Sequence, residues 1–153
     1  MLKKDLFRLQ QVLNHLKDVP NTKFAYALIK NLKKIDAEIG ILNELKQANK
    51  TATLEYEKKR IDLCTKHAEK DEMGTPIIEN NNYKILDVGT FTKELEDLRN
   101  VHSDDFDKQL KGEAEYINLL KEECDIDFYK MKPEDLPDNL TALQLEILEP
   151  LID

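Results

Sequence analysis

Four side chains that can bind a zinc ion are spread along the sequence. Cys64 and His67 have the spacing of half of a tetrahedral zinc site. His102 and Cys124 could complete the ligand set, but they are far apart in sequence, whereas structural sites usually take a close pair from each side. Cys64 also continues an apolar helical stripe, where a small thiol packs well. We therefore expect Cys64 to be buried and no metal to be bound.

A second group with possible chemistry is acidic, and comprises Asp104, Asp105, Asp107, Asp125 and Asp127. Carboxylates in this number could bind Mg²⁺, as in a metal-dependent nuclease. However, no His, Lys or Glu stands at a supporting motif spacing, and alternating aspartates are typical of a half-exposed strand. We interpret these residues as a solvated acidic face.

The common catalytic motifs are absent. The sequence has no P-loop, G-x-G-x-x-G, G-x-S-x-G or H-E-x-x-H motif. His15, His67 and His102 stand singly, so no pair of nucleophile and base can be argued from them. We expect a protein that is not an enzyme, with no catalytic residue and no cofactor.

Length and composition predict a single helix-rich domain, 1–153, with a modest core. The charged fraction is 35%, and the chain has no Trp and only four Gly, which favours helices over a β-sandwich or barrel. No apolar run approaches the roughly 20 residues that span a bilayer, and the N-terminus lacks the features of a secretion signal. Two cysteines do not imply a disulfide framework. We expect a cytoplasmic protein without a membrane partner.

The net charge of −8 conceals an asymmetry between the two halves of the chain. Residues 1–70 carry 15 Lys and Arg against 9 Asp and Glu, whereas residues 71–153 carry 8 against 22. The halves could complement each other within one fold, copies could pack basic end to acidic end, or one half could address a charged partner. Nucleic acid is not expected to bind, because the basic residues are interleaved with acids and aromatic residues are few.

The chain from Asn21 to about Lys70 is expected to form one long helix or two nearly continuous ones. Pro20 suits the entry to a helix, and no proline follows until Pro76. The weak point lies between Gln47 and Thr53, where β-branched threonines lower helix propensity. A helix of this length with one apolar stripe must lay that stripe on partners.

Shorter elements surround this helix. Apolar spacing predicts a helix over 2–18 and a returning helix over 91–120, interrupted by polar residues 102–107. The asparagines 80–82, which tolerate left-handed angles, predict a β-hairpin over 77–86. Alternation over 125–131 predicts a third strand of that sheet. Thr141 and Gln144 form a capping box that begins a C-terminal helix.

These elements define an α+β, mostly α, fold: a long antiparallel helical hairpin with a small β-hairpin or three-stranded sheet at one end and a short C-terminal helix. The expected segments are a basic helical hairpin (1–70), a β-hairpin region (71–89), an acidic return helix (90–123), and a strand plus C-terminal helix (124–153). The acidic surface of the return helix is expected to face the Lys-rich second helix. Exposed ion pairs of this kind select orientation more than they add stability.

Apolar residues at helical spacing are the candidate contact residues, in the core or against a protein partner. They are Leu28, Leu32, Ile35, Ile39, Leu42, Phe91, Leu95, Leu98, Leu145 and Leu148.

Short motifs of the C-terminal half resemble those of another group of proteins. They are D-E-M-G-T-P at 71–76, Y-K-I at 83–85, F-x-x-E-L at 91–95, D-I-D at 125–127, D-L-P at 135–137 and L-T-x-x-x-L-x-x-L-E-P-L-I at 140–152. With the Lys-rich helical start, this order is similar to that of small, acidic, uncharacterised proteins of tailed bacteriophages and prophages. The resemblance covers most of the chain, although each piece is short, and none of the pieces is a catalytic motif.

This resemblance implies a role in virion structure, assembly or host takeover. We expect a non-enzymatic bacteriophage structural or assembly protein that binds itself or another phage protein through helix faces, in the host cytoplasm or within the virion. The alternative is an acidic, phage-encoded inhibitor of a host defence or nucleic-acid-handling protein.

Overall fold

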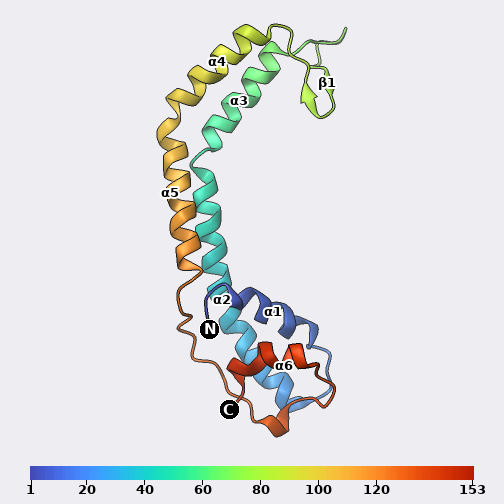
Figure 1. The fold of residues 1–153 in the computed structure, drawn as a ribbon. Coiled ribbons are helices and arrows are strands. Elements are labelled where there is room, and N and C mark those ends of the chain that lie inside the picture. The colour runs from blue at the N-terminus through green and yellow to red at the C-terminus, as the bar shows by residue number, and fades with distance from the viewer. The chain divides into compact units, whose positions relative to one another are not determined.

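A computed structural model describes the whole chain, Met1–Asp153, as mostly helical (Figure 1). Six α-helices and two short 3-10 helices make up 65% of the residues, and one two-stranded antiparallel sheet completes the regular structure. The prediction of an α+β, mostly α, protein is confirmed at this level. None of the helices is both long enough and apolar enough to cross a membrane.

The residues divide into two compact units. Unit 1 contains Met1–Lys46 and Ala114–Asp153, and unit 2 contains Gln47–Glu113. Two compact units can still unfold in one cooperative transition, as a single domain does. The single domain therefore stays a prediction. The elements in chain order are α1 (Asp5–His15), α2 (Thr22–Thr51), α3 (Leu54–His67), β1 (Ile78–Glu79), β2 (Asn82–Tyr83), α4 (Val88–Val101), α5 (Ser103–Leu119), η1 (Pro133–Asp135), α6 (Ala142–Leu148) and η2 (Glu149–Leu151).

The long helical stretch after Pro20 is interrupted once, between α2 and α3. Asn21 begins α2, because its side-chain oxygen accepts a hydrogen bond from the Phe24 amide at 3.1 Å. The helix ends at Thr51, and Ala52 and Thr53 form a turn before α3. The interruption therefore lies within the predicted weak segment, and the stretch is two nearly continuous helices.

Unit 1 has a dry core around the first half of α2. Leu28, Leu32, Ile35 and Ile39 of α2 are all at most 5% exposed and belong to one hydrophobic cluster. The cluster is completed by Leu6, Leu9 and Leu13 of α1, by Met131, and by Leu148 and Leu151 near the C-terminus. Helix α1 is shorter than the predicted 2–18, and Leu2 instead forms an isolated bridge with Glu123. Most residues of the predicted apolar stripe in α2 are thus buried within the molecule.

The predicted strand over 125–131 is wrong. Residues 124–130 have no regular structure, and Met131 forms only an isolated parallel bridge with Ile152. The sheet therefore has two strands, β1 and β2, and not three. The extended segment is held instead by Asn31 of α2, which is fully buried. Its side chain donates to the Tyr129 carbonyl at 2.9 Å and accepts from the Tyr129 amide at 2.8 Å, so it replaces the backbone of a neighbouring strand.

We predict that Asn31→Ala is destabilising because it leaves both backbone groups of Tyr129 without partners, at a cost of about 2 kcal/mol or more. The matched control is Asn43→Ala, an exposed position of the same helix with the same change in helix propensity. Urea unfolding of both variants gives the comparison. Equal changes in the free energy of unfolding would contradict this role for Asn31.

The predicted β-hairpin of unit 2 is confirmed. Strands β1 and β2 pair antiparallel, with Ile78 opposite Tyr83 and Glu79 opposite Asn82. The two residues between them, Asn80 and Asn81, have φ angles of 50° and 62°. Two successive left-handed residues form the turn that matches the twist of a two-residue hairpin, and asparagine tolerates this conformation better than most residues.

The returning helix of the prediction is also two helices, α4 and α5. Asp87 begins α4 by accepting a hydrogen bond from the Thr90 amide at 3.1 Å, and His102 separates α4 from α5. The predicted polar interruption was thus too long, because residues 103–107 are helical. The break at His102 lies beside the break between α2 and α3, since the His102 ring contacts Tyr56 at a centroid distance of 6.0 Å.

Helices α2 and α5 approach closely at Gly112. The Asn49 side chain donates to the Gly112 carbonyl at 2.9 Å. A Cβ atom on Gly112 would lie only 2.3 Å from the Asn49 Oδ1 atom and 2.8 Å from its Cγ atom. A Cβ atom at this position would therefore displace the Asn49 side chain, whereas the backbone angles of Gly112 do not require glycine.

We predict that Gly112→Ala changes sign with its background. In the native chain it displaces Asn49 and should destabilise by roughly 1 kcal/mol, because the lost hydrogen bond and clash exceed the gain in helix propensity. In the Asn49→Ala background the clash is gone, and the same change should stabilise by about 1 kcal/mol. Thermal or urea unfolding of the four proteins forms a double-mutant cycle. Additive effects would show that the two residues do not meet.

Candidate interaction surfaces

Of the four residues considered for zinc, the two cysteines are at least partly buried and the two histidines contact carboxylates. Cys64 is buried as predicted, and Cys124 lies in unit 1, where burial raises the pKa of its thiol. His67 contacts Glu94, and His102 contacts Asp105 through Nδ1 at 2.8 Å. No group of three or more His, Cys, Asp or Glu side chains is arranged to bind a metal ion.

The five aspartates considered for Mg²⁺ are divided between the two units. Asp104, Asp105 and Asp107 lie in the first turns of α5 within unit 2, whereas Asp125 and Asp127 are exposed in the extended segment of unit 1. Asp105 is engaged by His102 and, at 3.8 Å, by Lys108.

The predicted contact residues differ widely in exposure. Leu28, Leu32, Ile35 and Ile39 line the core of unit 1, and Leu42 is also buried. Phe91, Leu95 and Leu98 of α4 are only partly buried. Leu148 is fully buried, whereas Leu145 on the same helix is 40% exposed. The residues of α2 and Leu148 therefore have a structural role, and a role in binding a partner stays a prediction for the whole set.

An aromatic cluster that the sequence interpretation missed lies where Tyr56 of α3 meets the junction of α4 and α5. The Tyr56 ring packs edge-on against Phe106 at a centroid distance of 4.8 Å, and against His102. His102 is only 6% exposed, and its Nε2 atom is buried without a hydrogen-bond partner. The signal was present, because His102 follows Leu98 by four positions and so shares its helical face. It was overlooked because histidine was grouped with the polar residues that follow it.

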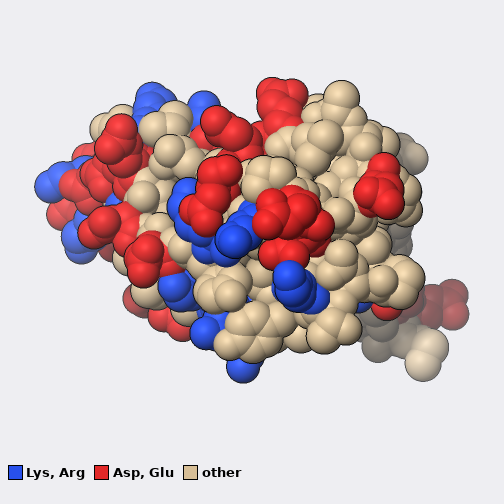
Figure 2. Space-filling view, turned by 90° about the horizontal axis from the view of Figure 1, so that it is seen from below, with Lys and Arg blue, Asp and Glu red and all other residues tan.

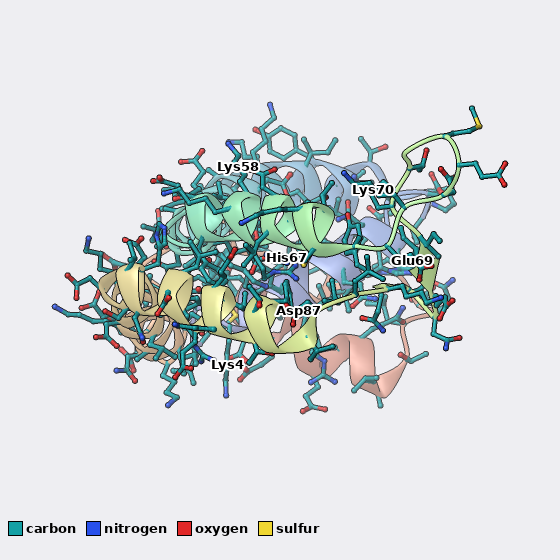
Figure 3. All side chains as sticks on the ribbon, turned by 90° about the horizontal axis from the view of Figure 1, so that it is seen from above. Lys4, Lys58, His67, Glu69, Lys70 and Asp87 are labelled. Carbon is teal, nitrogen blue, oxygen red and sulfur yellow. The ribbon has the colours of Figure 1, made fainter.

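The opposite end of the seam between α3 and α4 is charged. His67 lies between α3 and α4 (Figure 3), where its Nε2 atom is 3.0 Å from Glu94 Oε2. The same carboxylate oxygen is 2.9 Å from Lys66 Nζ. The hydrogen bond from His67, followed by that from Lys66, lowers the pKa of Glu94 below its ordinary value of 4.5. Lys66–Glu94 is a pairing of the predicted kind, basic helix to acidic helix.

The lysines expected to face the acidic helix were those at 30, 33, 34, 46, 50, 58 and 59, and three of them have different contacts. Lys59 pairs with Glu55 on its own helix, Lys34 donates to the Asp127 carbonyl, and Lys30 lies 5.0 Å from the Tyr26 ring centroid. The cross-helix ion pair that the structure shows for this surface is therefore the one between Lys66 and Glu94.

Two hollows lie on the surface of unit 2. The first, of about 430 Å³, lies along α3 and α4 and is lined by Lys59, Asp62, Leu63, Lys66, Glu94, Asp97 and Leu98. We call it the α3–α4 groove. The second, of about 470 Å³, lies at the junction of α4 and α5, where the Arg99 guanidinium carbon is 5.7 Å from the Phe106 ring centroid and Leu110 is 64% exposed. Both hollows combine apolar side chains with charged edges, which is typical of surfaces that bind proteins.

No family model matches this chain, and comparisons with curated proteins and with solved structures find no match.

We predict that Glu94→Gln is destabilising at pH 7 and that its effect disappears in acid. Because the pKa of Glu94 is lower in the folded state, the stabilisation is present above pH 4.5 and is lost as pH falls through the folded pKa. Urea unfolding of native protein and variant between pH 7 and pH 3.5 measures the difference. Glu96→Gln, an exposed change on the same helix, is the control and should have little effect at any pH. A difference independent of pH would contradict the assignment.

Proposed function

We propose that this chain is a non-enzymatic structural or assembly protein of a tailed bacteriophage that acts through protein–protein contacts along its helix faces. It would work in the host cytoplasm or as part of the virion. The context rests on the resemblance to small acidic phage proteins, and the mode of action rests on the exposed apolar side chains of α5.

The observation that carries the proposal is the incomplete burial of α5. None of its residues is buried. Leu110 and Ile117 are seven positions apart, and hence on one face of the helix, yet they are 64% and 52% exposed. An apolar face that the chain itself does not cover is typical of a site of protein association.

We also propose that the helices of unit 2 belong to a long antiparallel hairpin. Three contacts support it: Asn49 with Gly112, Tyr56 with Phe106, and Lys66 with Glu94. Residue numbers rise along one side of this series as they fall along the other, which is the register of antiparallel neighbours. Such a hairpin offers long faces to a partner.

The test is binding of the full-length protein to capsid, portal and tail proteins encoded by neighbouring genes. We predict that it retains at least one of them and that Leu110→Asp with Ile117→Asp lowers the affinity tenfold or more. Because both positions are exposed, circular dichroism should show an unchanged fold. The matched control is Ile29→Asp with Leu143→Asp, which changes two apolar residues of similar exposure, 54% and 53%, on other helices.

Two outcomes would overturn the proposal. One is that no virion protein binds, and the other is that both double variants weaken binding equally. Retention of a host nucleic-acid-handling or defence protein in place of virion proteins would instead favour the inhibitor hypothesis.

A further inference from the structure

The α3–α4 groove has a charge pattern that divides by helix. Its basic residues, Lys59 and Lys66, both come from α3, where one acid, Asp62, accompanies them. The groove residues of α4 that carry charge, Glu94 and Asp97, are both acidic. The groove thus has a predominantly basic edge and an acidic edge, which run side by side.

The floor between these edges is apolar and incompletely covered. Leu63 from α3 and Leu98 from α4 line the groove, and both are only partly buried. The hollow, of about 430 Å³, is open to solvent. Val101, one turn beyond Asp97 on α4, is 76% exposed and extends the apolar surface on this side of the helix.

We infer that the α3–α4 groove binds the same groove of a second copy of this chain. The inference rests on the proposed function and names the partner for this surface. Two-fold symmetry requires a surface that complements itself. A groove with one basic and one acidic edge meets this requirement, because rotation about an axis parallel to the helices places each α3 over the α4 of the other copy.

The charges select this axis over the alternative. Lys66 and Glu94 already lie at the same level of the groove, since they are 2.9 Å apart within one copy. Rotation about the parallel axis keeps that level, so Lys66 of each copy lies over Glu94 of the other, and Leu63 lies over Leu98. Rotation about an axis across the helices would place α3 over α3 and α4 over α4, and like charges would then oppose each other.

The product is a four-helix arrangement in which each copy contributes α3 and α4. It covers Leu63 and Leu98 from the side that the monomer leaves open, as in bundles whose core is formed between pairs of helices. Alternating charged edges around an apolar centre fix the pairing, as the flanking charges do in coiled coils.

Complementary charge variants test the inference on the full-length chain. Lys59→Glu with Lys66→Glu makes both edges acidic, and Glu94→Lys with Asp97→Lys makes both edges basic. By light scattering, the native protein should have twice the 17.8 kDa chain mass, and each variant alone should be monomeric. An equimolar mixture should form a one-to-one heterodimer, because every edge again meets its opposite.

The control is Lys58→Glu with Lys93→Glu, which makes the same change in net charge at exposed positions outside the groove. Figure 3 shows Lys58 on the side of α3 away from α4. This variant should remain dimeric. A second measurement does not depend on the folding of the reversed variants: mixed Lys66→Cys and Glu94→Cys proteins should form an intermolecular disulfide on air oxidation, and neither protein alone should form it.

A monomeric native protein at all concentrations would overturn the inference, and binding to virion proteins would then decide the proposed function separately. Persistence of the dimer in either reversed variant alone, or absence of both the heterodimer and the mixed disulfide, would show that the groove is not the interface. In that case association through another helix face would leave the proposed function standing.

Discussion

Two helices packed side by side share a single seam, and the width of that seam limits how many side chains they can bury. In unit 2 the seam between α3 and α4 buries Tyr56, Cys64 and His102, while the apolar residues of α4 remain half covered. In unit 1 the first half of α2 is surrounded by α1, α6 and the extended segment that Asn31 holds. The leucines and isoleucines of this part of α2 are therefore buried. The same apolar pattern therefore produces a core in one place and an open surface in the other.

The fold also removes the charge asymmetry of the sequence. Unit 1 combines residues from both ends of the chain and carries 12 Lys and Arg against 16 Asp and Glu, and unit 2 carries 11 against 15, so each has a net charge of −4. Figure 2 shows acidic and basic side chains interspersed on the face that it views. A segment with a charge of −14 in the sequence thus does not become an acidic body of its own. The negative charge is spread over both units, which favours short-range pairing over long-range attraction.

Local signals in the sequence identified several features correctly, because neighbouring residues determine them. The break after Thr51, the left-handed turn at Asn80 and Asn81, and the capping box at Thr141 and Gln144 are of this kind. The segment 125–131 was predicted wrongly because its alternation is satisfied by a side chain, Asn31, from a distant helix. The sequence also could not show that Leu110 would be exposed. The face of α5 that lies toward α2 is the one that contains Gly112, which approaches Asn49. Such choices depend on tertiary neighbours that periodicity does not specify.

The breaks at Ala52–Thr53 and at His102 lie side by side in unit 2, as the contact between Tyr56 and His102 indicates. At His102 the backbone hydrogen bonds of a helix continue, from the His102 amide to the Leu98 carbonyl at 3.2 Å and from the Phe106 amide to the His102 carbonyl at 3.3 Å. Tyr56, which packs against both His102 and Phe106, therefore links the two interrupted helical runs at this level.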